Sequence, residues 1–586
     1  MTRAFRFLLL LGTLMALPAP VAAEEATPSR SSINWDVKVP MRDGTKLAAV
    51  VYRPRIQKEP LPVILTLTPY TSRSTYSRGR YFSEHGYVFV SVDTRGRGNS
   101  EGEFDPFMKD GQDGYDLVEW LAKQSWCNGK VGMWGGSYLG FTQWATAKEF
   151  PPHLATIVPV ASPYLFKDFP TNKGIDSPYN AQWLTFTYGQ TDQQQAYGDD
   201  SHWSATVQAF GESGLPFRQI DRFAGIPSEP FQRWLKHPMF DSYWAVTVPS
   251  PSAYQRFDIP ILTITGHYDD DQNSALAYFR EHERLGSDSA KLKHFLVIGP
   301  WDHSGTRTPT REYEGVDLGP GALVDLNALH KAWYDWTLKS GSKPAFLKAR
   351  VACYVIGPNE WIYAKGLGEL TTRTQTLFLH ANGRMDTSKA NQEPSSRIQH
   401  DPADPRPNQL EGLQSKAGKL TLPNAALISF GRQFFDQSLV FTTEPFVESV
   451  TLSGNPHFTA WVRMDVPDED FFAALFEVLP DGNVIQLSQD VMRARYRDSI
   501  TVEKLVVPGE PTRLEFKDMP FFARRIGKGS RLKLVFGAIT TPWAQTNYHS
   551  GKVVADETPK DARVAHIEFL HDSGHASVLE LPIGNQ

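Results

Sequence analysis

The chain has 586 residues, of which 41% are hydrophobic and 21% charged, the balance of an ordinary globular protein. This length favours two or three domains over one. The formal net charge of -5 gives no reason to expect nucleic acid or an anionic membrane as a partner.

The first residues resemble an export signal. Two arginines precede the apolar run 7–17, and Val21-Ala22-Ala23 provides small residues for cleavage. This layout is typical of a secretory signal peptide, residues 1–23, and is too short for a stable spanning helix. We therefore expect an exported chain, secreted or periplasmic, without a membrane partner once the signal is removed. A retained anchor is the alternative.

The chain contains only two cysteines, Cys127 and Cys353, too few for a disulfide scaffold. Whether they pair is open at this point. No Cys-x-x-Cys and no His-Glu-x-x-His occurs, and the histidines are scattered. We expect neither a metal nor a cofactor.

The first half of the chain alternates apolar runs with helical periodicity. Residues 37–54 predict a β-hairpin around Asp43-Gly44, and residues 113–123 predict a helix. The apolar runs typical of buried parallel strands are 61–68, 87–93, 131–134, 157–160 and 261–265. This alternation favours an α/β fold with a doubly wound sheet, in which active sites form at the carboxyl ends of the strands.

The most informative stretch, Gly135-Gly136-Ser137-Tyr138-Leu139-Gly140, lies between a strand and a helix-like segment, 141–150. Such a stretch predicts a nucleophile elbow, whose glycines permit the helix to pass close to the strand. In the usual Gly-x-Ser-x-Gly pattern the second glycine would stand at Leu139. An ordinary glycine-rich turn therefore remains the alternative.

After residue 160 the strand signal lapses until about residue 248, and tryptophans, tyrosines and phenylalanines are frequent. We interpret this segment as a helical cap inserted over the sheet. Simple packing of the cap on the core would explain most of these aromatic residues.

Two later strands end in ionisable residues. The run 261–265 leads into Asp269-Asp270-Asp271, and the run 295–298 leads into Asp302-His303. The order serine, aspartate, histidine is that of α/β-hydrolases. Ser137 would attack an ester or amide carbonyl and His303 would transfer its proton. The residues alone leave any of these four aspartates as the third member.

Helical patterning largely stops after residues 333–338. Short runs at 351–356, 376–380, 450–452, 471–478, 532–536 and 577–581 read as strands of an all-β sandwich. A boundary near residues 341–343 divides the chain into a catalytic domain, 24–342, with its cap at about 164–248, and a sandwich, 343–586. Residues 386–420 are polar and predict a long surface excursion.

Six stretches resemble the X-Pro dipeptidyl-peptidase-like superfamily of serine hydrolases, of the cocaine esterase, glutaryl acylase and α-amino acid ester hydrolase type. They are residues 41–45, 93–98, 135–140, 266–269, 299–303 and 492–497. The family elbow is Gly-x-Ser-Tyr-x-Gly, which matches Gly140. The resemblance implies an α/β-hydrolase domain with a helical cap and a C-terminal jelly-roll domain.

The resemblance also implies site residues. It selects Asp269 as the third member of the triad, through a Tyr-Asp pair. The backbone N–H of Tyr138 is one expected oxyanion donor, and the resemblance assigns the other to the phenol hydroxyl of Tyr70.

In the amino-ester hydrolase branch an acidic cluster binds the α-ammonium group of the substrate. Asp271 stands where that branch has an acid, Gln272 where it has a second one, and Asp168 could supply another carboxylate. Asp168 and Asp271 are therefore candidate substrate-binding residues, although the incomplete cluster favours their interpretation as solvated surface acids. If they converge, they would favour a cationic substrate group.

We therefore predict a serine hydrolase of the acylase or esterase type that acts on a small ester, amide or short peptide. A preference for α-amino acyl groups and a homo-oligomeric state are both options. An X-Pro dipeptidyl peptidase is one alternative. The lactic-acid-bacterial enzymes carry an extra N-terminal helical domain, and only a few residues separate the predicted signal from the first strand here, which disfavours this alternative. A non-catalytic carbohydrate- or ligand-binding protein is the other, and it would require a broken triad.

Overall fold

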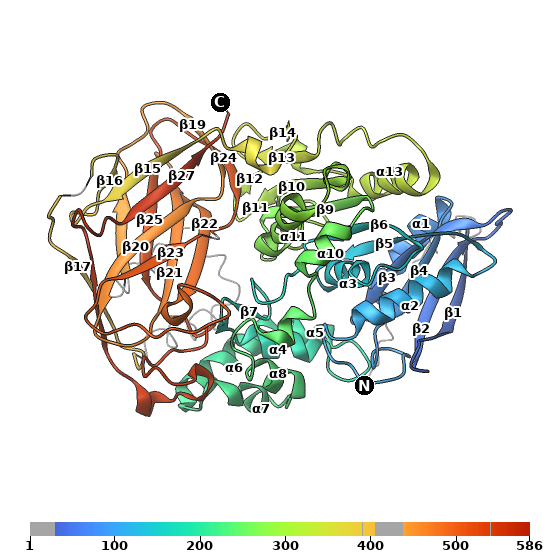
Figure 1. The fold of residues 1–586 in the computed structure, drawn as a ribbon, viewed down its shortest axis with the longest axis horizontal. Helices are drawn as coiled ribbons and strands as arrows, with labels where there is room; N and C mark the ends of the chain where they lie inside the picture. The colour runs from blue at the N-terminus through green and yellow to red at the C-terminus, as the bar shows by residue number, and fades with distance from the viewer. Residues whose placement is uncertain (1–29, 390, 405–437, 518, 540, 586) are drawn as a thin grey trace, which may run out of the picture.

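The computed structural model describes residues 30–389, 391–404, 438–517, 519–539 and 541–585 (Figure 1). The predicted signal peptide and residues 390 and 405–420 of the predicted surface excursion lie outside these ranges. None of the helices in the described ranges is both long and apolar enough to cross a bilayer.

A ten-stranded mixed sheet forms the first layer, in the order β1-β2-β4-β3-β5-β6-β9-β10-β13-β14. The strands are β1 (Ser31–Pro40), β2 (Lys46–Pro54), β3 (Leu61–Thr68), β4 (Val88–Asp93), β5 (Cys127–Gly136), β6 (Leu154–Val160), β9 (Ile261–Tyr268), β10 (His294–Asp302), β13 (Val351–Val355) and β14 (Glu360–Ala364). Neighbours from β4 to β13 run parallel, and β1, β2 and β14 pair antiparallel. The predicted α/β architecture is confirmed.

Helices cover both faces of this sheet because its central strands are apolar on both sides. Phe82 and Trp333 bring α1 and α13 onto one face, and Trp144 and Tyr278 bring α3 and α11 onto the other, with rings stacked 4.6 Å apart. The helices are α1 (Tyr76–Glu84), α2 (Asp110–Ala122), α3 (Tyr138–Ala147), α10 (Pro251–Arg256), α11 (Gln272–Leu285), α12 (Asp288–Lys291) and α13 (Leu326–Lys339). Burial of each such aromatic side chain stabilises the fold by about 1.5–3 kcal/mol.

Between β6 and β9 the chain leaves the sheet and forms short helices and one small hairpin, here called the cap. Its elements are β7 (Thr171–Asn172), β8 (Ile175–Asp176), α4 (Tyr179–Phe186), α5 (Gln194–Tyr197), α6 (Asp200–Ser213), α7 (Ile220–Phe223), α8 (Glu229–Trp234) and α9 (Ser242–Ala245). Most of the aromatic residues predicted for this segment pack together, including Trp183, Trp203, Phe231, Trp234 and Trp244. Figure 1 shows the cap in teal and green, alongside both large domains.

The second domain is built from antiparallel strands in two sheets. They are β15 (Arg373–Leu379), β16 (Met385–Asp386), β17 (Ser396–His400), β18 (Ser438–Thr442), β19 (Val450–Gly454), β20 (His457–Met464), β21 (Asp470–Val478), β22 (Val484–Arg493), β23 (Thr512–Phe516), β24 (Phe522–Ile526), β25 (Arg531–Ala538), β26 (Ala565–Phe569) and β27 (Val578–Ile583). Phe458 of one sheet and Phe536 of the other meet with ring centroids 5.6 Å apart in a shared core. This is the predicted all-β domain, hereafter the sandwich; its jelly-roll topology stays a prediction.

One strand predicted for the sandwich belongs to the first sheet instead. Residues 351–356 were assigned to the sandwich, yet β13 pairs parallel with β10, and β14 follows it in the first sheet. A short apolar run between turns looks the same in either setting, which explains the error. Cys353 therefore shares a sheet with Cys127, and both cysteines are buried and free.

The two domains are joined by hydrogen bonds. The Ile356 N–H donates to Ala523 O (3.0 Å), and the Arg525 N–H donates to Ile356 O (2.9 Å). The Gln272 amide donates to Phe521 O and accepts from Phe521 N–H, both at 2.8 Å. Gln272, which stands where an amine-binding acid was considered, is therefore a structural tie between domains.

Candidate active site

Ser137 lies at the junction of β5 and α3 with φ 61° and ψ −128°, the left-handed backbone that a non-glycine residue adopts only under constraint. Its N–H lies 2.9 Å from Val160 O and 3.1 Å from Ala161 O at the end of the neighbouring strand. A Cβ on Gly140 would lie 2.9 Å from Val160 O. Because α3 passes so close to the end of β6, position 140 requires glycine. This glycine stands one residue later than in the usual Gly-x-Ser-x-Gly pattern.

His303, which follows β10, is held by the carboxylate of Asp269, which follows β9. The Nδ1–Oδ1 distance is 2.8 Å, and the side chain of Asp269 is fully buried. Thr265 Oγ1 donates to the other carboxylate oxygen at 2.7 Å. Burial alone would raise the pKa of Asp269, but the contacts with His303 and Thr265 outweigh it and hold that pKa below its usual value.

The other three aspartates lie differently. Asp271 Oδ2 is 3.7 Å from His303 Nδ1, beyond hydrogen-bond length. Asp302 accepts the Gly305 N–H at 2.6 Å and so stabilises its own turn. Asp270 lines the cavity described below and is exposed. Among the four, the geometry favours Asp269 as the partner of His303.

Tyr70 and Tyr138 flank the nucleophile position. The Trp183 indole N–H donates to Tyr70 Oη at 3.1 Å, so the Tyr70 hydroxyl hydrogen remains available to another acceptor. Burial raises the pKa of Tyr70, which keeps the phenol protonated. The Tyr138 ring is turned away, because its hydroxyl donates to Asp110 at 2.8 Å. Its backbone N–H belongs to the first turn of α3, where no intrahelical acceptor exists.

The sequence analysis gave no role to Arg97, which fastens the cap to the loop of Tyr70. Arg97 is fully buried, and its guanidinium donates to Pro69 O (2.7 Å), Thr187 O (2.7 Å), Gly189 O and Thr191 O (3.1 Å). Four carbonyls from two segments thus share one planar cation. In the sequence, Arg97 was marked only by its place in residues 93–98, one of the six stretches that resemble the family.

One cavity of about 340 Å³ unites the predicted residues. It is lined by Tyr70, Phe107, Ser137, Tyr138, Pro163, Asp168, Phe169, Pro170, Asn172, Ile175, Ser177, Tyr179, Asn180, Trp183, Asp270, Asp271 and His303. The size suits a small ligand, and aromatic walls with a few polar groups are typical of such sites. All seven residues proposed from the sequence border this cavity or, for Asp269, bond directly to a residue that does.

The carboxylates of Asp168 and Asp271 converge on the cavity, which overturns their interpretation as solvated surface acids. The Ser274 N–H donates to Asp168 at 3.1 Å and its hydroxyl donates as well. Burial raises the pKa of Asp168 to about 7. Burial, and next the neighbouring Asp168, raise the pKa of Asp271 well above its usual value. Two acids with raised pKa values therefore line the same cavity as Ser137.

A second polar group lies in the sandwich, where no metal was predicted. His400 Nδ1 and His549 Nε2 lie 2.9 Å and 3.1 Å from Glu469 Oε2, and the three could hold a metal ion. These are also the lengths of hydrogen bonds. The carboxylate raises the pKa of His549 to about 9 against the opposing effect of burial, so an imidazolium–carboxylate pair accounts for the cluster.

The fold and the cavity together define the class: a serine hydrolase on an α/β-hydrolase sheet. The family model of X-Pro dipeptidyl-peptidase (S15 family) matches residues 43–305, and that of the X-Pro dipeptidyl-peptidase C-terminal non-catalytic domain matches residues 336–580. The chain belongs to this X-Pro dipeptidyl-peptidase-like superfamily of serine hydrolases. The predicted family and enzyme class are confirmed, and the non-catalytic alternative loses its support.

Relatives span the full length of the chain. Cocaine esterase from Rhodococcus sp. (strain MB1 Bresler) is 28% identical and covers 94% of this chain and 98% of its own. An α-amino acid ester hydrolase structure matches with a TM-score of 0.81 at 22% identity, over 96% of this chain and 100% of that one. An aminopeptidase from a marine sediment Thaumarchaeota archaeon gives 0.81 and 22%, over 98% and 100%. The two structures show the shared fold.

Proposed function

We propose that the chain cleaves ester or amide bonds through an acyl-enzyme, with Ser137, His303 and Asp269 as the triad. Ser137 Oγ attacks the carbonyl while His303 Nε2 takes its proton, and the same imidazole then protonates the leaving group. Water releases the acyl group by the reverse sequence. The observation that carries this proposal is the pairing of His303 with a fully buried carboxylate beside a serine at a strained elbow.

The direct test is labelling with a fluorophosphonate probe, which reacts with the activated serine of such hydrolases. We expect one label per chain, on the peptide that contains Ser137, and loss of ester hydrolysis in parallel. Peptide mass spectrometry locates the label. Labelling at another serine, or full activity after complete labelling, would overturn the assignment.

The Tyr70 hydroxyl and the Tyr138 N–H are proposed to bind the oxyanion of the tetrahedral intermediate. Tyr70→Phe is expected to lower kcat about 10²-fold while KM changes little, because the donor acts mainly on the transition state. Steady-state kinetics with p-nitrophenyl esters measure both constants. A drop confined to KM would assign Tyr70 to substrate packing instead.

The paired carboxylates of Asp168 and Asp271 support a preference for acyl groups that carry an α-ammonium. A cation placed between them would be attracted by both and would lower their raised pKa values. The aromatic walls around them suit an apolar side chain on the same acyl group. We therefore infer α-amino acyl esters or amides as substrates, acted on outside the cytoplasm after export.

The preference has a pH signature. As pH falls through about 7, Asp168 gains a proton and its attraction for an ammonium is lost. We expect KM for phenylglycine methyl ester, expressed as the concentration of its ammonium form, to rise several-fold between pH 7.5 and pH 5.5, while KM for uncharged phenylacetic acid methyl ester stays flat. Steady-state kinetics at both pH values test this; equal pH dependence would argue against amine recognition.

An X-Pro dipeptidyl peptidase remains the second candidate, because it would use the same amine anchor. Glycyl-prolyl anilide, assayed on the same preparation, separates the two: a proline-specific enzyme would cleave it faster than alanyl-alanyl anilide. Equal or slower cleavage favours the ester hydrolase.

A further inference from the structure

One wall of the candidate active site is made by the hairpin of β7 and β8, residues 171–176. Asn172 and Ile175 of this hairpin, and Ser177 just after it, line the cavity. Two strands of two residues each cannot hold a fixed shape alone. Their position must therefore be set by what surrounds them.

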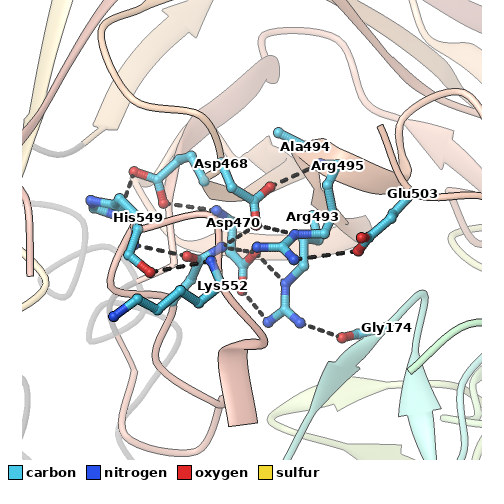
Figure 2. A network of polar contacts seen from close by, with 12 residues as sticks. Gly174, Asp468, Asp470, Arg493, Ala494, Arg495, Glu503, His549 and Lys552 are labelled. Atoms are coloured by element: carbon cyan, nitrogen blue, oxygen red, sulfur yellow. Dashed lines mark hydrogen bonds and ion pairs between the residues drawn. The ribbon is translucent and has the colours of Figure 1, made fainter. Parts of the chain in front are cut away.

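Arg493, at the end of β22 in the sandwich, contacts the tip of this hairpin. Its Nη1 donates to Gly174 O at 2.6 Å, as Figure 2 shows. Gly174 has φ +84°, and a Cβ there would lie 2.4 Å from the Tyr496 ring. The tip is thus pressed directly against the sandwich, and only glycine fits.

Further bonds fix both sides of the hairpin to the same domain. The Lys173 ammonium lies 2.6 and 2.7 Å from the two carboxylate oxygens of Asp490. The Gln545 N–H donates to Asp176 O at 2.8 Å, and Ser177 Oγ donates to Trp543 O at 2.8 Å.

Arg493 is itself rigid. Its Nε and Nη2 bind the two oxygens of Asp470, both at 2.8 Å, and Nη2 also reaches Gln545 Oε1 at 3.0 Å. Asn547 donates to Asp470 at 3.0 Å from the other side. The guanidinium is almost completely buried. Because it is planar and two of its nitrogens are held by Asp470, the third nitrogen, Nη1, has a fixed direction toward Gly174 O.

We infer that Arg493 is a positioning residue for acyl-group selection: through Gly174 it fixes the cavity wall, so the sandwich sets which acyl groups fit. This inference rests on the proposed function. Arg493 does not touch the reacting atoms. A lysine could pair with Asp470 but could not also reproduce the fork that holds Gly174 O.

The test compares Arg493→Lys with the unchanged protein on p-nitrophenyl acetate and p-nitrophenyl phenylacetate. We expect KM for the bulky phenylacetyl ester to rise about tenfold, while KM for the acetyl ester changes less than twofold, because a displaced wall affects only the group that reaches it. Asp490→Asn, which loosens Lys173 and leaves Arg493 intact, should shift the same ratio in the same direction, by about threefold. If Arg493→Lys does not fold, this second variant decides alone.

Arg495→Lys is the matched control. Arg495 is equally buried and pairs with Asp468 at 2.7 Å, but its side-chain bonds stay within the sandwich. It should lower thermal stability without changing the ratio of the two KM values. The inference is overturned if Arg495→Lys gives the same ratio, or if both hairpin variants affect the two esters equally. Fluorophosphonate labelling of the unchanged protein distinguishes this from failure of the proposed function.

Discussion

Replacement of Ser137 by alanine is expected to lower kcat/KM for p-nitrophenyl acetate by about four to six orders of magnitude. Loss of the nucleophile removes the acyl-enzyme pathway, and only binding and oxyanion stabilisation remain. The strained backbone at Ser137 is held by bonds of its N–H to the end of β6 and not by its side chain. The melting temperature should therefore stay within a few degrees.

Ser304→Ala is the control for this substitution. Ser304 is exposed beside His303, and alanine there should leave kcat/KM within about twofold of the unchanged protein. Residual activity above 1% in Ser137→Ala, with the fold intact by circular dichroism, would assign the chemistry to another group.

Asp269→Asn is expected to lower kcat by about four orders of magnitude. An amide at this position has one acceptor oxygen instead of two, whereas Thr265 contacts one oxygen of Asp269 and His303 contacts the other. The His303 ring would then favour the wrong tautomer and lose the charge that stabilises its imidazolium. Single-turnover kinetics show whether acylation is the step that slows.

The same substitution at Asp302 provides the comparison, because the Asp302 carboxylate accepts the Gly305 N–H and so stabilises the turn that contains His303. We expect Asp302→Asn to cost less than tenfold in kcat. If Asp302→Asn and Asp269→Asn were equally harmful, the buried bond between Asp269 and His303 would not be the one that matters for catalysis.

The sequence predicted the sheet, and it predicted that the proposed site residues lie at the ends of its strands, since hydrophobic runs mark buried parallel strands and a polar residue follows each of these runs. Ser137, Asp269 and His303 each follow such a run, and parallel strands bring their carboxyl ends to one edge. The proposed role of Tyr70 as an oxyanion donor came from the family resemblance, because no motif around Tyr70 indicates that role. Its bond to Trp183 joins residues 113 positions apart.

The errors have a common cause. Residues 351–356 look the same in a parallel sheet and in a sandwich, so their partner could not be inferred. Asp168 lies in the cap and Asp271 on the sheet edge, so only the folded chain shows that they converge. In the sequence, Gln272 stands where the amino-ester hydrolase branch has an acid. In the structure, its amide bonds the backbone N–H and carbonyl of Phe521 in the neighbouring domain.

The hairpin at residues 171–176 also bears on how the enzyme is made. Its contacts with the sandwich join residues 317 to 369 positions apart. Such non-local contacts are slow to form because long loops must close first. The nucleophile and its histidine lie upstream of every one of these partners. During synthesis Ser137 and His303 are therefore translated before the sandwich residues that hold this hairpin. We infer that the growing chain acquires its proposed catalytic residues before the contacts proposed to select its substrate.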